Sequence, residues 1–305
     1  WRVRSNSLSI TTDTTASDQR MGWLGDAQVF ARTATFNADV HQFFARFTQT
    51  MRDSQAADGG YPNYAPSYVV NPQRGGWLAW AAAGVIVPYE TYQQYGDTTL
   101  IEEHYESMKR FIDGIHEGGK IQGYQYLTNR SGIGDHLSIE PTDTALMYNA
   151  IYGYLVGLLA EMADVFGMTE DANHYADLHE SIKAEWNTAF VDPETFKTRN
   201  VEGVTQHTQT SYALPLHYGM FNDAYRQHAA KHLAHLTKEA GYTITTGFLG
   251  TAPMNPALSA NGYNDIAYKL IESTEYPSWL YPVINGATST WERWNSYTHE
   301  DGFGG

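Results

Sequence analysis

Three carboxylates, a guanidinium and a large indole lie close together near the start of the chain, between Asp13 and Asp26. This mixture is costly to bury in a core but suits a sugar pocket, because aromatic faces stack on C–H bonds and charged groups bond hydroxyls directionally. The candidate residues are Asp13, Asp18, Gln19, Arg20, Trp23 and Asp26. The alternative is a helix start with acidic caps, which explains one or two acids but neither Arg20 nor Trp23.

A second candidate cluster is Trp291-Glu292-Arg293-Trp294. A carboxylate between two indoles is expected to lie in a partly desolvated place. The alternative is an exposed loop with an ion pair between Glu292 and Arg293. Both interpretations remain open from the residues alone.

Two weaker clusters follow the same pattern of aromatic and polar residues. Trp77 and Trp80 precede an Ala-rich helix, and at least one of these indoles is expected in the core. Asp135 and His136 are adjacent, but a single Asp-His pair is weak as a dyad. Because no second His or carboxylate falls at ligand spacing, no metal site is predicted.

Composition narrows the function classes. With 305 residues, 42% hydrophobic and 17% charged, the chain is typical of a globular protein. A net charge of −15 without a Lys/Arg cluster argues against nucleic acid as a partner. No Cys is present, and no apolar run is long enough for a membrane span. We expect a piece of a longer protein, periplasmic or extracellular rather than cytoplasmic.

Hydrophobic spacing of three and four residues predicts a mostly helical chain. Asp97 is a candidate N-cap for the stripe that follows it. Strand signals are sparse and no low-complexity linker occurs, so we predict one all-α domain over residues 1–305, an α/α toroid with its site lined by loops. The expected helices cover 36–51, 75–94, 101–115, 144–166, 170–190, 208–218, 222–238, 256–272 and 275–285.

Glycoside hydrolysis is the chemistry that best fits acids and Trp residues spread over a helical scaffold. It needs one protonated acid at the leaving oxygen and one carboxylate that activates water or attacks. The sequence lacks a Gly-x-Ser-x-Gly elbow, a phosphate-binding Gly-Lys loop and a His-Glu-x-x-His zinc motif.

The chain also resembles the catalytic domain of bacterial and fungal α-L-rhamnosidases, through nearly all of its length. The Asp13–Asp26 stretch is similar to the family's Asp-Cys-Pro-Gln-Arg-Asp-Glu-Arg-Leu-Gly-Trp-Thr-Gly-Asp. Further similar motifs follow in the same order: Val-Ile-Val-Pro at 85–88, Tyr-Gly-Asp at 95–97, Gly-Asp-His-Leu at 134–137, Thr-Thr-Gly-Phe-Leu-Gly-Thr at 245–251, Tyr-Pro-Ser-Trp at 276–279, and Gly-Ala-Thr and Trp-Glu-Arg-Trp at 286–294. The ordered set is what makes the resemblance specific.

The resemblance implies an (α/α)6 barrel that hydrolyses terminal α-L-rhamnosides with inversion, and the chain need not contain this barrel completely at either end. By this resemblance Glu292 is the general base, no cofactor is needed, and the partner is a rhamnose-containing glycoside, oligosaccharide or polysaccharide. The residues expected to bind substrate are Asp13, Asp18, Arg20, Trp23, Asp26, Trp80, Asp135, His136 and Trp291.

The chain departs from the family pattern at the general acid, because Gln19 occupies the position of the acidic Glu. An amide donates a hydrogen bond but cannot protonate a leaving alkoxide. Ala82 and His136 stand where the family has Asp and Trp. Gln19 is an engineered change, a natural variant in which another group such as Asp18 is the acid, or the mark of a silent carbohydrate-binding protein. A helical-toroid polysaccharide lyase, using Tyr61, Tyr64 or His136, is a further alternative that the acidic net charge disfavours.

Overall fold

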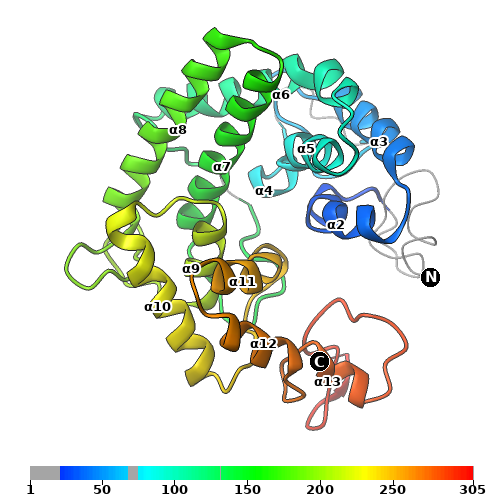
Figure 1. Ribbon diagram of the computed structural model, residues 1–305, viewed down its shortest axis with the longest axis vertical. Coiled ribbons are helices and arrows are strands. Elements are labelled where there is room, and N and C mark those ends of the chain that lie inside the picture. Colours follow the sequence, from blue (N-terminus) through cyan, green and yellow to red (C-terminus); the bar gives the residue numbers. More distant parts are fainter. Residues whose placement is uncertain (1–20, 68–74, 131, 305) are drawn as a thin grey trace. The chain divides into compact units, whose positions relative to one another are not determined.

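The computed structural model describes residues 21–67, 75–130 and 132–304, which are mostly helical (Figure 1). The elements are α2 Leu24–Asn37, α3 His41–Asp53, α4 Leu78–Ala81, α5 Ala83–Tyr95, α6 Thr99–Ile121, α7 Thr144–Val165, α8 Thr169–Phe190, α9 Gln209–His217, α10 Asp223–Glu239, α11 Phe248–Ala260, α12 Asn264–Glu272, α13 Leu280–Ile284, and the antiparallel strands β1 Tyr297–Thr298 and β2 Gly302–Phe303.

Contacts divide the chain into two compact units, each built from two separate stretches. The first unit comprises Trp1–Gly132 and Tyr148–Glu185, and the second comprises Ile133–Met147 and Trp186–Gly305. In the first unit α2 and α3 pack against α5, which also packs against α6. In the second unit α9 packs against α10 and α11, and α11 packs against α12. The prediction of one domain over residues 1–305 stays a prediction.

The long central helices agree with the hydrophobic spacing in the sequence. The prediction of 144–166 is confirmed by α7, on which apolar residues such as Leu155 and Leu159 are fully buried. The prediction of 170–190 is confirmed by α8, where Trp186 and Ile182 are also fully buried. Burial of large apolar side chains supplies most of the stability of such helices.

Three predicted helices are divided, and a local backbone conformation explains two of the divisions. The predicted helix 36–51 is interrupted at Ala38, whose extended backbone (φ −157°, ψ 158°) ends α2 and leaves Phe36 70% exposed. The predicted helix 256–272 is wrong because α11 ends at Ala260 and α12 starts at Asn264. Between them Gly262 has φ +90°, a left-handed conformation that glycine tolerates.

Smaller corrections concern helix ends. The N-cap of α6 is Thr98 and not Asp97, although the Asp97 carboxylate still accepts the Thr99 N–H at 3.0 Å. The predicted helix 75–94 is divided into α4 and α5, and 275–285 is reduced to α13. A hydrogen bond such as that from Thr99 to Asp97 can shift the start of a helix by one residue without changing the fold.

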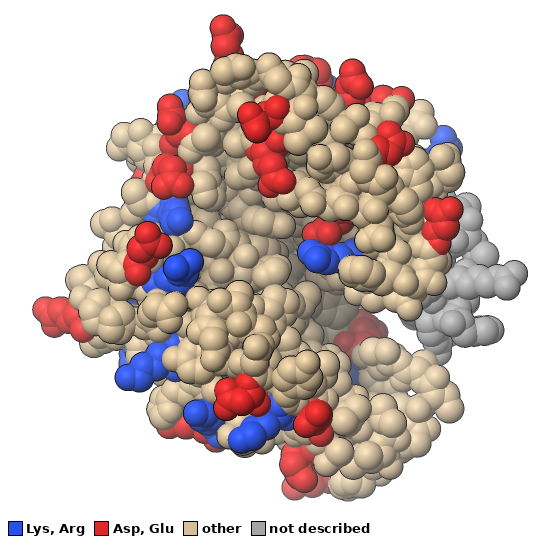
Figure 2. All heavy atoms as spheres, in the orientation of Figure 1, with Lys and Arg blue, Asp and Glu red and all other residues tan. Residues whose placement is uncertain are grey.

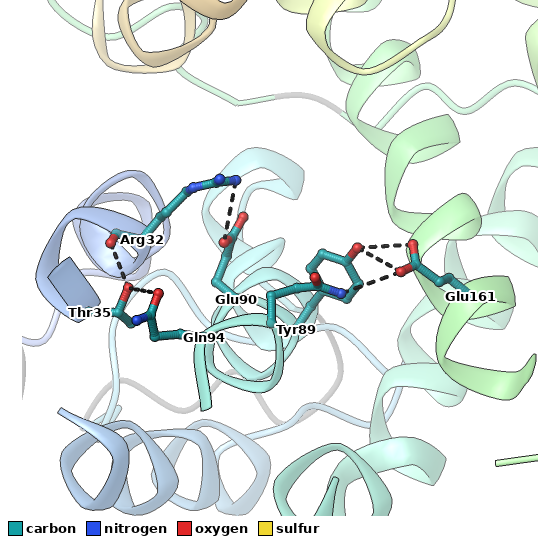
Figure 3. A network of polar contacts seen from close by, with 7 residues as sticks. Arg32, Thr35, Tyr89, Glu90, Gln94 and Glu161 are labelled. Carbon is teal, nitrogen blue, oxygen red and sulfur yellow. Dashed lines mark hydrogen bonds and ion pairs between the residues drawn. The ribbon is translucent and has the colours of Figure 1, made fainter. Parts of the chain in front are cut away.

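A polar network joins α5 to α7 within the first unit (Figure 3). The Tyr89 hydroxyl donates to the Glu161 carboxylate, at 3.0 and 2.9 Å from its two oxygens. Burial and this hydrogen bond raise the pKa of Tyr89 above its ordinary value. Arg32 lies 4.0 Å from Glu90, but Arg32 is largely exposed, so this ion pair adds little stability. The Tyr89–Glu161 contact is therefore the main polar link of the network.

Two adjacent glycines near the end of α6 give a matched test of packing. A Cβ at Gly119 would overlap the backbone carbonyl of Leu127, whereas a Cβ at Gly118 would meet nothing within 4 Å. We expect Gly119→Ala to lower the free energy of unfolding by about 1–3 kcal/mol. Gly118→Ala should raise it by up to about 1 kcal/mol, because alanine favours helix. Urea unfolding of both variants checks this, and equal effects would contradict the close contact at Gly119.

The buried histidine His104 makes stability depend on pH. Burial lowers its pKa from 6.5 to about 4, and the positive charge of Arg52 acts in the same direction. Between these values the unfolded chain binds a proton that the folded chain does not, so stability is fully present above pH 6.5 and falls toward pH 4. The loss reaches about 3 kcal/mol. We expect His104→Gln to flatten this dependence in urea unfolding at pH 7 and 4.5. His235→Gln, at an exposed position, should leave it unchanged.

The surface carries a dispersed charge. On the face shown in Figure 2, basic side chains are scattered among acidic ones and form no extended basic patch. Within the described ranges, no helix is both long and apolar enough to cross a membrane.

Candidate functional site

Four of the candidate residues lie outside the described residues: Asp13, Asp18, Gln19 and Arg20. Their roles stay predictions from the sequence. The remaining candidates fall into two groups, one in each unit, and each group has its own geometry.

In the first unit, Trp23 is held at the start of α2 by a short pairing with Tyr64. The Leu24 N–H donates to the Asn63 carbonyl and the Ala65 N–H donates to the Gly22 carbonyl, both at 2.9 Å. The Trp23 and Tyr64 rings meet edge to face at 5.2 Å. Trp23 is therefore a half-buried indole fixed by backbone bonds on both sides, as a stacking residue needs to be.

Asp26 lies in the first turn of α2, where a carboxylate stabilises the positive end of the helix dipole. The N-cap itself is Trp23, whose side chain makes no cap hydrogen bond. The helix-start interpretation thus accounts for the place of Asp26 but not for Trp23. The half-buried carboxylate remains a candidate for sugar binding.

Trp80 is more buried than a pocket residue should be. It is 3% exposed, and a Cβ at Gly25 would overlap its ring. It packs edge to face on Trp77 at 5.8 Å, and Trp77 is only half-buried. Trp80 is therefore a core residue among the described residues, whereas Trp77 presents the more accessible indole. This geometry argues against a broad contact between Trp80 and substrate.

Asp135 is buried in the second unit, where it caps α11. Its Oδ2 accepts the Thr210 hydroxyl at 2.6 Å and the Gly247 N–H at 2.8 Å. Its Oδ1 accepts the N–H groups of Leu249 at 2.8 Å and Gly250 at 3.2 Å. Burial raises the pKa of Asp135, and these four hydrogen bonds act against the rise. With its lone pairs in use and 5% exposure, Asp135 is a structural residue, which argues against the predicted direct contact with substrate.

His136 is half-buried beside this cap. Its carbonyl accepts the Phe248 N–H at 2.9 Å, and its ring lies edge to face on Phe248 at 5.2 Å. Burial lowers the pKa of His136, while the negative charges of Glu292 and Asp135 raise it. Both candidates belong to the second unit, where the negative charge of Glu292 acts on the His136 imidazole.

Glu292 is exposed on a loop between α13 and β1, which agrees with the exposed-loop alternative and not with the predicted desolvation. The two neighbouring indoles face other groups. Trp294 donates its Nε1–H to the Thr246 carbonyl at 2.7 Å and packs edge to face on Trp279 at 5.8 Å. Trp291 packs on Tyr297 at 6.1 Å. The carboxylate is left open to water, which a general base requires.

Sequence reasoning gave no role to several residues that shape these groups. The Asn63 side chain accepts the Trp77 N–H at 2.7 Å and so links the two indole segments of the first unit. Thr210 and Thr246 hold the cap and Trp294 in the second unit. In the sequence, single Asn and Thr residues such as these are weak indicators of a role in a site, because such polar residues are also common in turns. In the part of the chain that the structure describes, no group of three or more His, Asp or Glu could hold a metal ion.

Comparison with known proteins identifies the domain. A family model described as bacterial alpha-L-rhamnosidase 6 hairpin glycosidase domain matches residues 1–303. Curated relatives named alpha-L-rhamnosidase come from Formosa agariphila (35% identical, covering 99% of this chain and 32% of the relative) and Streptomyces avermitilis (35%, 99% and 28%). The chain therefore spans about a third of the length of these relatives.

Solved structures agree in fold. The Streptomyces avermitilis alpha-L-rhamnosidase complexed with L-rhamnose has a TM-score of 0.91 at 34% identity, over 100% of this chain and 28% of the other. The Aspergillus terreus enzyme has a TM-score of 0.87 at 30% identity, over 99% and 35%. The predicted all-α (α/α)6 barrel class is confirmed by these matches, and the resemblance in the sequence is confirmed with it. The chain belongs to the bacterial α-L-rhamnosidase six-hairpin glycosidase domain family.

Proposed function

We propose that this domain hydrolyses terminal α-L-rhamnosides. The observation that carries the proposal is the match of residues 1–303 to a glycosidase domain family. Relatives at 35% identity are named for this activity, and a structural neighbour was solved with L-rhamnose. A rhamnose-containing glycoside or oligosaccharide is the substrate class that follows. The lyase alternative gains no support from any of these matches.

The proposed mechanism is inversion, with Glu292 as general base. Its exposed carboxylate takes a proton from the attacking water, while the His136 imidazole offers a hydrogen bond to a sugar hydroxyl. Inversion needs the base and the acid roughly 6.5–9.5 Å apart, so that water fits between base and sugar. The acid position is that of Gln19, so leaving groups that need protonation are expected to react slowly.

Substrate binding is proposed for the half-buried groups and not for the buried ones. Trp23 and Trp291 are half-buried indoles that would stack on the sugar, and the half-buried Asp26 would bind its hydroxyls. Asp13, Asp18 and Arg20 keep the ring-binding roles that the resemblance implies. Trp80 supports the candidates of the first unit from the core of that unit, and Asp135 supports those of the second unit from its core.

A silent carbohydrate-binding protein is the second candidate, favoured by one structural observation besides Gln19. Ala82, where the family has Asp, is the fully buried N-cap of α5 and offers no carboxylate. A binding protein of this kind retains the aromatic contacts to the sugar and has lost turnover.

Proton NMR of the reaction with an aryl α-L-rhamnoside tests the proposal. A good leaving group needs little acid assistance, so hydrolysis is expected despite Gln19. Under inversion the first sugar released is the β-anomer. Release of the α-anomer first would overturn inversion. Release of no sugar by either this chain or its Gln19→Glu variant, together with binding of L-rhamnose in calorimetry, would replace the hydrolase with the binding protein.

A further inference from the structure

The buried carboxylate of Asp135 connects three segments of the second unit that are distant in sequence. It accepts a hydrogen bond from α9 through Thr210 and three from the first turn of α11. The Gly247 N–H that it binds lies 112 residues further along the chain. Gly247 is the N-cap of α11 and has no side chain to serve as a cap, so Asp135 supplies the cap from outside the helix.

The charge of Asp135 suits this position. Hydrogen bonds to an ionised acceptor are stronger than neutral ones, and a helix N-terminus attracts negative charge. An amide replacing the carboxylate cannot reproduce the contacts, because one of its two ends is an NH2 donor that would face another N–H or the Thr210 hydroxyl. The cap therefore depends on the carboxylate itself.

The packing around the cap leaves no room for adjustment. A Cβ at Gly250 would lie 2.9 Å from Asp135 Oδ2, and a Cβ at Gly247 would overlap the His136 carbonyl. Both positions require glycine, because backbone atoms of the Asp135 segment lie against Gly247 and the side chains of Thr210 and Asp135 lie against Gly250. We therefore expect loss of one hydrogen bond here to move the backbone of 247–250.

A direct path leads from this cap to the proposed general base. The carbonyl of Thr246, the residue before Gly247, accepts the indole N–H of Trp294 at 2.7 Å. Trp294 follows Glu292 by two residues in the same loop. The position of the Thr246 carbonyl thus sets the position of the Trp294 indole, and the indole anchors the loop that carries Glu292.

We propose that Asp135 is a positioning residue for Glu292, acting through the first turn of α11, the Thr246 carbonyl and the Trp294 indole. Its structural part stands on the hydrogen bonds alone. Its catalytic part rests on the proposed function, because it assumes that Glu292 is the base. The two parts call for separate measurements.

The structural part is tested by NMR of the full chain with nitrogen-15 labelled Trp, in which Trp294→Phe assigns the Trp294 indole signal. We expect Asp135→Asn to shift this signal and to speed exchange of its proton with water. Thr210→Val, which removes one hydrogen bond to Asp135, should shift it less in the same direction. If Asp135→Asn does not fold, the shift of the Trp294 indole signal in Thr210→Val alone tests the structural part.

Asn187 provides the matched control. It is buried in the second unit and bonds the Met220 carbonyl at 2.7 Å and the Asn222 N–H at 3.2 Å. Asn187→Ala should destabilise the unit without moving the Trp294 indole signal. An unmoved signal in both Asp135→Asn and Thr210→Val, or an equal shift in Asn187→Ala, would overturn the proposal.

The catalytic part is tested by a double-mutant cycle of Asp135→Asn and Trp294→Phe on an aryl α-L-rhamnoside. Misplacement of a reacting group by 1 Å costs about 100-fold in rate, so we expect kcat to fall by up to about 100-fold with KM nearly unchanged. Because both changes act on one path, the double variant should lose less than the product of the single losses. Multiplicative losses, or a change in KM alone, would overturn this part. If the parent chain releases no rhamnose, the proposed function fails and the indole signal still decides the structural part.

Discussion

Gln19→Glu should raise the rate of hydrolysis of a rhamnoside with a poor leaving group, such as a natural disaccharide, by roughly 100- to 10,000-fold. This is the range that general acid catalysis contributes. A carboxylic acid delivers a proton to the leaving alkoxide, whereas the amide of Gln19 has none to give at neutral pH. An aryl substrate with a good leaving group should gain far less. The measurement is kcat/KM of both substrates for both proteins.

The contrast between the two substrates is the informative quantity. Gln227→Glu, at an exposed position on α10, adds the same charge elsewhere and should change neither rate. Equal acceleration of both substrates would point to an effect on binding rather than on proton donation. No acceleration of either would assign the acid to another group, for which Asp18 is the nearest candidate in the sequence.

Glu292→Gln should lower kcat by roughly 100- to 10,000-fold on both substrates, because every leaving group needs the attacking water to be activated. The change preserves shape and removes the proton acceptor. It should leave stability within about 0.5 kcal/mol, since the side chain is exposed. Rates are best measured in the Gln19→Glu background, where the starting activity is higher, together with a thermal unfolding curve.

Glu300→Gln is the control for this second prediction. Glu300 is exposed in the turn between β1 and β2, so its replacement removes a charge from the same segment without touching the loop of Glu292. It should retain the parent rate. A Glu292→Gln protein that keeps its rate within a few-fold would show that Glu292 is not the base.

The helical framework could be predicted because it follows from local spacing. Apolar residues repeat at helical intervals through α7 and α8, and they are buried nearly all round α7 and along one side of α8, so pattern and structure coincide. The failures are breaks in such patterns. Gly262 lies in the largely polar stretch 261–265 between two apolar stripes, and its left-handed backbone makes the turn there. A single glycine is a weak signal in sequence and a decisive one in structure.

The residue types of the candidate site could be predicted from the sequence. Which of these residues are buried and structural, and which are accessible to substrate, could not. Asp135 and Trp80 have the chemistry of binding residues, yet their partners are Gly247 and Gly25, which the sequence does not pair with them. Burial of this kind is set by contacts between distant segments, which hydrophobic spacing does not encode. Glu292 differs in the opposite direction, because it is exposed where the sequence predicted a partly desolvated carboxylate. Its neighbouring indoles pack toward Thr246 and Tyr297.

The discontinuous make-up of the second unit has a consequence for the order in which the chain becomes structured. Synthesis delivers the segment Ile133–Met147 before residues 148–185, which complete the first unit, and only afterwards the stretch from Trp186 onward. Until Thr210 and the first turn of α11 emerge, Asp135 has none of the four donors that hold it in the finished protein. A polypeptide ended at residue 185 would therefore present an unpaired carboxylate on a segment that belongs to the absent unit. Because each unit is made of two separate stretches, a single cut of the chain yields neither unit alone.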